Sequence, residues 1–128
     1  MTKSTSPTKL SLAELRKRGY MVAVVEKFNP FVKIRQDLWN FGDLLCVHPI
    51  NKEFLIVQTT SDKGGNVSKH KQKVQDNKNL KIWLEAGGKF LIHGWAKKGK
   101  AGKRKLWTLR EVKISENATT TKDKENEL

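Results

Sequence analysis

Three oxygen-bearing side chains stand at the ends of apolar segments, at a spacing that suits metal chemistry. Glu26 lies near the end of the segment 20–28, Asp43 directly precedes the apolar run 44–47, and Gln58 lies near the end of another apolar run. Hard divalent cations such as Mg²⁺ prefer oxygen ligands, take few of them from the protein and keep several waters. A bound Mg²⁺ (or Mn²⁺) polarises a phosphate and lowers the pKa of an attacking water. These side chains would therefore suit metal-assisted hydrolysis of a phosphodiester.

Three predicted strands would bring these side chains together. Strands are expected over 20–28, 44–47 and 53–60, because these segments are rich in β-branched, aromatic and other apolar residues and are bounded by turn residues. The connections between them are short enough for an antiparallel meander. In a meander, the end of the first strand, the start of the second and the end of the third lie at one edge of the sheet. The three oxygen-bearing side chains are expected to converge there.

The segments around the first strand carry weaker signals. A helix is expected over 11–18, because Ser11 and Glu14 have the spacing of a capping box and Gly19 can end the helix in a left-handed conformation. The segment 31–41 mixes apolar and charged positions and is expected to be a loop with at most one turn of helix.

The second half of the chain completes an α/β pattern. Helices are expected over 66–76 and 80–86, and strands over 89–95 and 106–114, the last two joined as a hairpin. The order of helix, three strands, helices and two strands predicts an α/β fold with a mixed sheet and a C-terminal β-hairpin.

Length and charge limit the class of protein. The chain has 128 residues, with 26 Lys and Arg against 13 Asp and Glu, hence a net charge of +13. We expect one folded domain over 11–114, a disordered basic lead over 1–10, and a disordered acidic tail over 115–128 with four acids against two lysines. A field of this sign favours polyanions, of which nucleic acid is the commonest.

Other features argue against membranes, disulfides and nucleotide cofactors. The apolar runs are too short for a transmembrane helix, and the first ten residues lack the apolar region of a signal peptide. A cytoplasmic protein without membrane contact is therefore expected. The single cysteine, Cys46, excludes an intrachain disulfide and is expected to be a packed thiol; His93, in a predicted strand, is expected to be structural. Walker A and GxGxxG motifs are both missing.

Basic residues gather in three places. Six cations lie between Trp95 and Trp107, others lie on the predicted helix 66–76, and two precede Asp43. Such residues would contact phosphates, whereas the two tryptophans are expected in the core rather than stacked on bases. The expected nucleic-acid contacts are Lys33, Arg35, Lys69, Lys73, Lys97, Lys98, Lys100, Lys103, Arg104 and Lys105.

Two segments, Arg35-x-Asp37-Leu-Trp-x-Phe-Gly-Asp43-Leu-Leu and Phe54-Leu-Ile-Val-Gln58-Thr-Thr60-Ser61, resemble the core of PD-(D/E)XK nucleases. This superfamily includes restriction enzymes, archaeal-type Holliday junction resolvases and small phage nucleases. The resemblance covers roughly residues 11–97 and implies a restriction-endonuclease-like αβββαβ core. It also implies a Mg²⁺-dependent endodeoxyribonuclease, structure-selective on branched DNA, and a homodimer, since two nicks need two sites.

The resemblance assigns roles to particular residues. Asp43 matches the family's metal-binding aspartate, Gln58 falls on its acidic position and Thr60 on its lysine, so the last two depart from the pattern. Glu26 would be a third ligand or orient the water, and Thr60 would at best position a water. A lysine nearby in the chain would replace the missing one, and the candidates are Lys63, Lys69 and Lys73.

Simpler interpretations stay open. Asp43 can be a turn residue, Gln58 an ordinary strand residue, and Glu26 a solvent-facing one. Asp37 can pair with Arg35 or enter the site, and the sequence does not decide between them. The departures also favour a second function, a catalytically inactive DNA- or RNA-binding domain on the same fold. A third possibility is an unrelated basic binding protein with an OB-type barrel, in which the predicted ligands would not converge.

Overall fold

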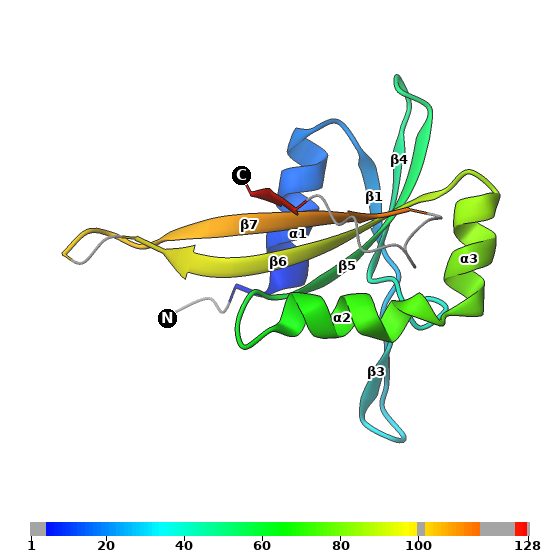
Figure 1. The fold of residues 1–128 in the computed structure, drawn as a ribbon, viewed down its shortest axis with the longest axis horizontal. Helices are drawn as coiled ribbons and strands as arrows, with labels where there is room; N and C mark the ends of the chain where they lie inside the picture. Colours follow the sequence, from blue (N-terminus) through cyan, green and yellow to red (C-terminus); the bar gives the residue numbers. More distant parts are fainter. Residues whose placement is uncertain (1–4, 100–101, 116–124, 128) are drawn as a thin grey trace.

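The structure, a computed structural model, describes residues 5–99, 102–115 and 125–127. A mixed sheet of five main strands, extended at one edge by a short sixth, lies between helices (Figure 1). The strand order is β1-β4-β5-β6-β7-β8, and β2 and β3 form a separate two-stranded sheet. The elements are α1 (Pro7–Lys17), β1 (Met21–Val24), β2 (Lys27–Asn29), β3 (Ile34–Gln36), β4 (Leu44–His48), β5 (Glu53–Ser61), α2 (Asn66–Gln75), α3 (Lys78–Glu85), β6 (Lys89–Lys98), β7 (Leu106–Ile114) and β8 (Glu125–Glu127).

The pairing of the strands confirms the predicted α/β fold with a mixed sheet. β1, β4 and β5 form the antiparallel meander, with Val22 opposite Cys46 and Cys46 opposite Leu55. The helices α2 and α3 then lead from β5 to β6, which is parallel to β5. β6 and β7 pair antiparallel as the predicted hairpin, and its far end extends beyond the body of the protein (Figure 1).

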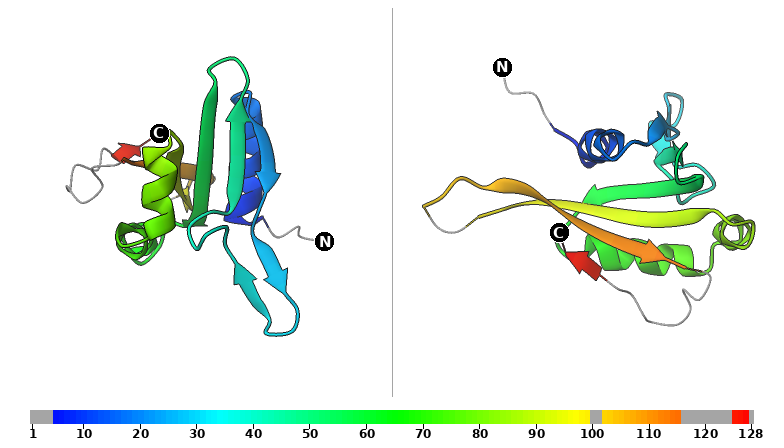
Figure 2. Two further views of the ribbon diagram at one scale, coloured as in Figure 1. Left: turned by 90° about the vertical axis from the view of Figure 1, so that its right-hand side faces the viewer. Right: turned by 90° about the horizontal axis from the view of Figure 1, so that it is seen from above.

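The two faces of the sheet carry separate apolar clusters, because side chains alternate along each strand. α1 covers one face and α2 lies on the other (Figure 2). Leu15 of α1 belongs to the cluster that contains Cys46, and Val67 and Val74 of α2 belong to the cluster that contains Ile56. Cys46 is buried, as predicted, and burial raises the pKa of its thiol to about 12.

The first helix starts earlier than predicted, and its predicted capping box is wrong. The N-cap is Ser6, whose Oγ accepts a hydrogen bond from the Lys9 amide at 3.2 Å, and Pro7 occupies the first helical turn, where its missing N–H costs nothing. Ser11 is instead fully buried in the middle of the helix. Gly19 ends the helix with a φ of 97°, as predicted. The first turn of α1 therefore belongs to the folded domain rather than to the lead.

The predicted loop over 31–41 contains a strand, which is a second correction. β2 and β3 form a hairpin with Phe28 opposite Arg35, and Figure 2 shows it projecting away from the main sheet. The amide of Phe31 donates to Asn29 Oδ1 at 3.0 Å, a local bond that favours the turn. The predicted strand 20–28 is accordingly split into β1 and β2. The sequence pattern does not reveal β3, because the hairpin exposes its apolar residues.

Two further expectations concern the membrane and the tail. Among the helices of the described residues, none is long and apolar enough to cross a bilayer. The predicted acidic tail, 115–128, lies mostly outside the described residues, and its residues 125–127 pair with β7 as β8.

Candidate metal centre

An acidic cluster lies at the sheet edge where β1 ends and β4 begins. Glu26, Asp37 and Asp43 each place one carboxylate oxygen within 4.8 Å of the others. Asp43 is buried, with 2% of its surface exposed, and the other two are half-buried. Three carboxylates at this separation repel one another unless protons or a cation intervene. Their oxygens are the donor set that Mg²⁺ or Mn²⁺ prefers.

Backbone hydrogen bonds hold Glu26 beside Asp43. The carbonyl oxygen of Asp43 accepts from the amides of Val25 at 2.8 Å and of Glu26 at 3.3 Å. Gly42 lets the chain pass close to the core, because a Cβ at this position would lie 2.5 Å from Ile56 Cγ2. The meander thus places these two acids together, as the sequence predicted.

The β2–β3 hairpin brings in the third acid. Glu26 directly precedes β2 and Asp37 directly follows β3, and Lys27 and Gln36, the end residues of the two strands, are paired. The two acids therefore flank the base of one hairpin, one next to each strand, and are called its feet below. Asp37, for which the sequence left two roles open, lies in the site.

Gln58 and Thr59, in the second half of β5, complete the set of polar groups around the acids. Gln58 Nε2 donates to Asp43 Oδ2 at 3.1 Å and to Asp37 Oδ2 at 3.2 Å. Asp43 Oδ2 also accepts from the Thr59 amide at 2.7 Å and hydroxyl at 3.1 Å. Gln58 is 3% exposed, and its buried Oε1 has no hydrogen-bond partner among the described residues. Rotating the amide by half a turn would direct that oxygen at the carboxylates and at an ion between them.

The closeness of the three carboxyl groups affects the pKa of Asp43. Burial, assisted by the nearby carboxyls of Asp37 and Glu26, raises the pKa of Asp43 to about 8, against the opposing effect of the Thr59 amide. A cation bound at the cluster would lower the pKa of Asp43 again, since a positive charge favours the carboxylate form.

A lysine of α2 lies next to the acids. Lys73 Nζ is 3.7 Å from Asp37 Oδ2. Lys63, Lys69 and Lys73 are all exposed, and among them Lys73 is the one for which an ion pair with an acid of the cluster is seen in the described residues. His70, one helical turn before Lys73, is half-buried, and its Nδ1 has no partner within the described structure. Burial and Lys73 lower the pKa of His70, and Asp37 opposes them. The sequence singled out Lys73 as one of three candidates and did not single out His70.

Thr60 lies apart from this constellation. It is half-buried on β5, opposite Gly94 of β6, and no hydrogen bond of the described residues joins its side chain to the cluster. Its neighbour Thr59, which the sequence did not single out, makes the contact to Asp43 instead.

The remaining predicted basic contacts are spread over two projections. Lys33 is exposed at the tip of the β2–β3 hairpin, and Arg35 lies in β3. Trp95 is buried, as predicted, but Trp107 is 39% exposed with Lys97 Nζ 5.2 Å from its ring centre, so its core placement is wrong. Lys100 lies outside the described residues. The other predicted contacts of the β6–β7 hairpin among the described residues are exposed: Lys98, Lys103, Arg104 and Lys105.

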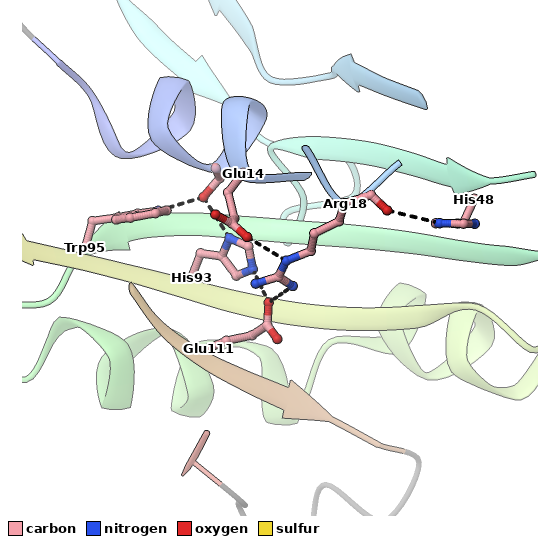
Figure 3. Close-up of polar contacts among 7 residues, drawn as sticks. Glu14, Arg18, His48, His93, Trp95 and Glu111 are labelled. Atoms are coloured by element: carbon pink, nitrogen blue, oxygen red, sulfur yellow. Dashed lines mark hydrogen bonds and ion pairs between the residues drawn. The ribbon is translucent and has the colours of Figure 1, made fainter. Parts of the chain in front are cut away.

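A second polar network joins α1 to β6 and β7 (Figure 3). Ser11 Oγ lies 2.8 Å from His93 Nδ1, and His93 Nε2 lies 2.8 Å from Glu111 Oε2. The order of serine, histidine and acid resembles a hydrolase triad, but Ser11 and His93 are both 0% exposed, and Trp95 Nε1 donates to the Ser11 hydroxyl at 2.8 Å. Arg18 also donates to Glu111. The network is structural, and His93 has the role predicted for it.

Comparison with protein-family models, with curated proteins and with solved structures finds no match for this chain.

Proposed function

We propose that this protein is a metal-dependent nuclease that hydrolyses phosphodiester bonds in nucleic acid. The observation that carries the proposal is the meeting of Glu26, Asp37 and Asp43 within 4.8 Å, with the buried amide of Gln58 against two of them. Gln58 Oε1 has no hydrogen-bond partner among the described residues, and buried polar atoms normally have one, so a half-turn of the amide that brought this oxygen to a bound ion would satisfy it.

The topology supports a PD-(D/E)XK-like fold as part of the proposal. The order α1, β1, β4, β5, α2 with α3, and β6 corresponds to αβββαβ, once the β2–β3 hairpin is regarded as an insertion. Asp43 directly precedes the second strand of this core, and Gln58 lies in the second half of the third. These are the positions at which the family carries its aspartate and its second acid.

Each residue then has a chemical role. Mg²⁺ or Mn²⁺ would supply a Lewis acid and a water of lowered pKa. Asp43, Asp37 and Glu26 would hold the ion, and the Thr59 amide would orient Asp43. Lys73 would offset the charge that develops on the phosphate, in place of the lysine that Thr60 does not supply.

The substrate follows from charge. A net charge of +13 and the exposed cations of the β6–β7 hairpin favour a nucleic acid, with DNA preferred on the resemblance. Branched DNA, which resolvase-like nucleases cut as homodimers, is the form we propose. The second candidate is a non-catalytic DNA- or RNA-binding domain, which Gln58 and Thr60 favour because they lack the charges of the family pattern.

The test is metal-dependent cleavage of junction, flap and linear DNA. Wild type should cut with Mg²⁺ or Mn²⁺ and stop when EDTA is added. Asp43→Asn, which preserves shape and hydrogen bonding, should reduce the rate at least about a hundredfold. Asp76→Asn, the same change at an exposed site, should leave it unaltered. DNA binding without cleavage, in protein that calorimetry shows to bind Mn²⁺, would establish the binding domain instead.

A further inference from the structure

The β2–β3 hairpin displays a set of apolar side chains to solvent. Phe31 at its tip is 95% exposed, and Phe28, Val32 and Ile34 are 58%, 56% and 57% exposed. None of them belongs to either apolar cluster of the fold. Exposed apolar patches on soluble proteins usually mark a binding surface.

The same hairpin is basic. Its ten residues, 27–36, carry Lys27, Lys33 and Arg35 and no acid. A partner must therefore combine apolar surface with negative charge. Nucleic acid does so, because its bases are apolar faces flanked by phosphates. A second copy of this hairpin does not, since two copies would bring six like charges together.

The hairpin rises directly from the acidic cluster. Its feet are Glu26 and Asp37, and Phe31 is five residues beyond Glu26. At about 3.3 Å per residue in a strand, the tip stands about 15 Å from the cluster. With phosphates about 3.4 Å apart along each strand of a duplex, this is a distance of about four base pairs.

We infer that the β2–β3 hairpin is a wedge that inserts Phe31 between bases at a branch point of DNA whose phosphate lies at the acidic cluster. The inference rests on the proposed function and specifies its substrate: DNA with unstacked bases about four pairs from the cut. Apolar wedges of this kind separate base steps at the cost of stacking, which is least where bases are already unpaired. Lys27 and Lys33 would contact the flanking phosphates.

The test places 2-aminopurine, a base whose fluorescence rises on unstacking, at the branch point of a junction. Binding is measured with Ca²⁺, a divalent cation used to separate binding from hydrolysis. Wild type should raise the fluorescence several-fold and bind the junction at least about tenfold more tightly than linear duplex. Phe31→Ala should lose both effects and keep its affinity for linear duplex.

Phe54→Ala is the matched control. Phe54 is 56% exposed near the start of β5, and the turn beside it lies at the opposite end of the protein from the β2–β3 hairpin (Figure 1). This variant should behave as wild type. A Phe31→Ala protein indistinguishable from wild type in fluorescence and junction preference would overturn the inference.

Binding partners of the hairpin other than DNA would give different results. If light scattering without DNA shows a dimer that Phe31→Ala converts to a monomer, the partner is a second copy and the wedge is refuted. Binding to anionic vesicles that Phe31→Ala abolishes, with no fluorescence change on DNA, would refute it in favour of a membrane. Cleavage is assayed separately: a fluorescence rise without cleavage would reject the nuclease and retain the wedge.

Discussion

Replacing Asp43 by asparagine should stabilise the metal-free protein while removing metal binding. The side chain is buried, and burial together with the carboxyls of Asp37 and Glu26 raises its pKa from 3.8 to about 8. The folded state therefore favours the protonated form. The contribution of Asp43 to stability is fully present below pH 3.8 and is lost as the pH rises towards 8. Asparagine is neutral throughout and can still accept the amide hydrogen bond of Thr59.

The size of the effect follows from the shift. Each pH unit between the two pKa values costs about 1.4 kcal/mol, so wild type should lose about 2 to 3 kcal/mol relative to Asp43→Asn between pH 5 and pH 7. For a domain of this length, that corresponds to a difference in Tm of about 10 °C.

The assay is thermal and urea unfolding of both proteins in EDTA at pH 5 and pH 7, with Asp76→Asn reporting the same substitution at an exposed site. Asp43→Asn should be more stable than wild type, and this difference in the free energy of unfolding should be about 2 to 3 kcal/mol larger at pH 7 than at pH 5. Adding Mg²⁺ at ten times its dissociation constant should then restore about 1.4 kcal/mol to wild type and nothing to Asp43→Asn. An equal difference in stability between the two proteins at pH 5 and pH 7 would refute the crowding of charges on which the proposed metal centre depends.

Three more predictions concern catalysis, the buried network and the charge of the protein. Lys73→Ala should slow cleavage about tenfold to a hundredfold with little change in DNA affinity, whereas Lys78→Ala, at an exposed position of α3, should leave the cleavage rate unchanged in single-turnover assays. Glu111→Gln should cost about 2 kcal/mol in urea unfolding, because it weakens the bonds to Arg18 and His93. Burial alone would raise the pKa of Glu111, but His93 and Arg18 lower it, so wild type should lose this stabilisation as the pH falls below 4.5 and Glu111→Gln should lack that loss. DNA affinity should fall at least about tenfold between 50 and 200 mM salt, as fluorescence anisotropy would show, and a flat response would contradict a phosphate-driven interaction.

Local patterns determined the central part of the fold. The apolar runs at 44–47 and 53–60 are separated by a turn too short for anything but an antiparallel pair, and this pairing alone sets Asp43 close to Gln58. The same reasoning placed Glu26 near them. Periodicity and turn residues act over a few positions, so the sequence carries this information directly.

The hairpin and the first helix show where local patterns fail. The apolar residues of β2 and β3 face solvent, so their spacing does not follow the inside–outside alternation by which strands are recognised. Ser11 has the type and spacing of an N-cap, but it is bonded to His93, 82 residues away, and buried by the sheet. A local preference worth about 1 kcal/mol gives way to packing of this kind.

The sequence by itself determined the meander, the basic surface and two of the three acids that now meet. Only the tertiary structure decided that Asp37 joins them and that Lys73 Nζ of α2 lies 3.7 Å from Asp37 Oδ2. Asp37 and Lys73 are 36 positions apart in the chain. Contacts over such separations depend on how helix and sheet pack together, which no periodicity of either segment encodes.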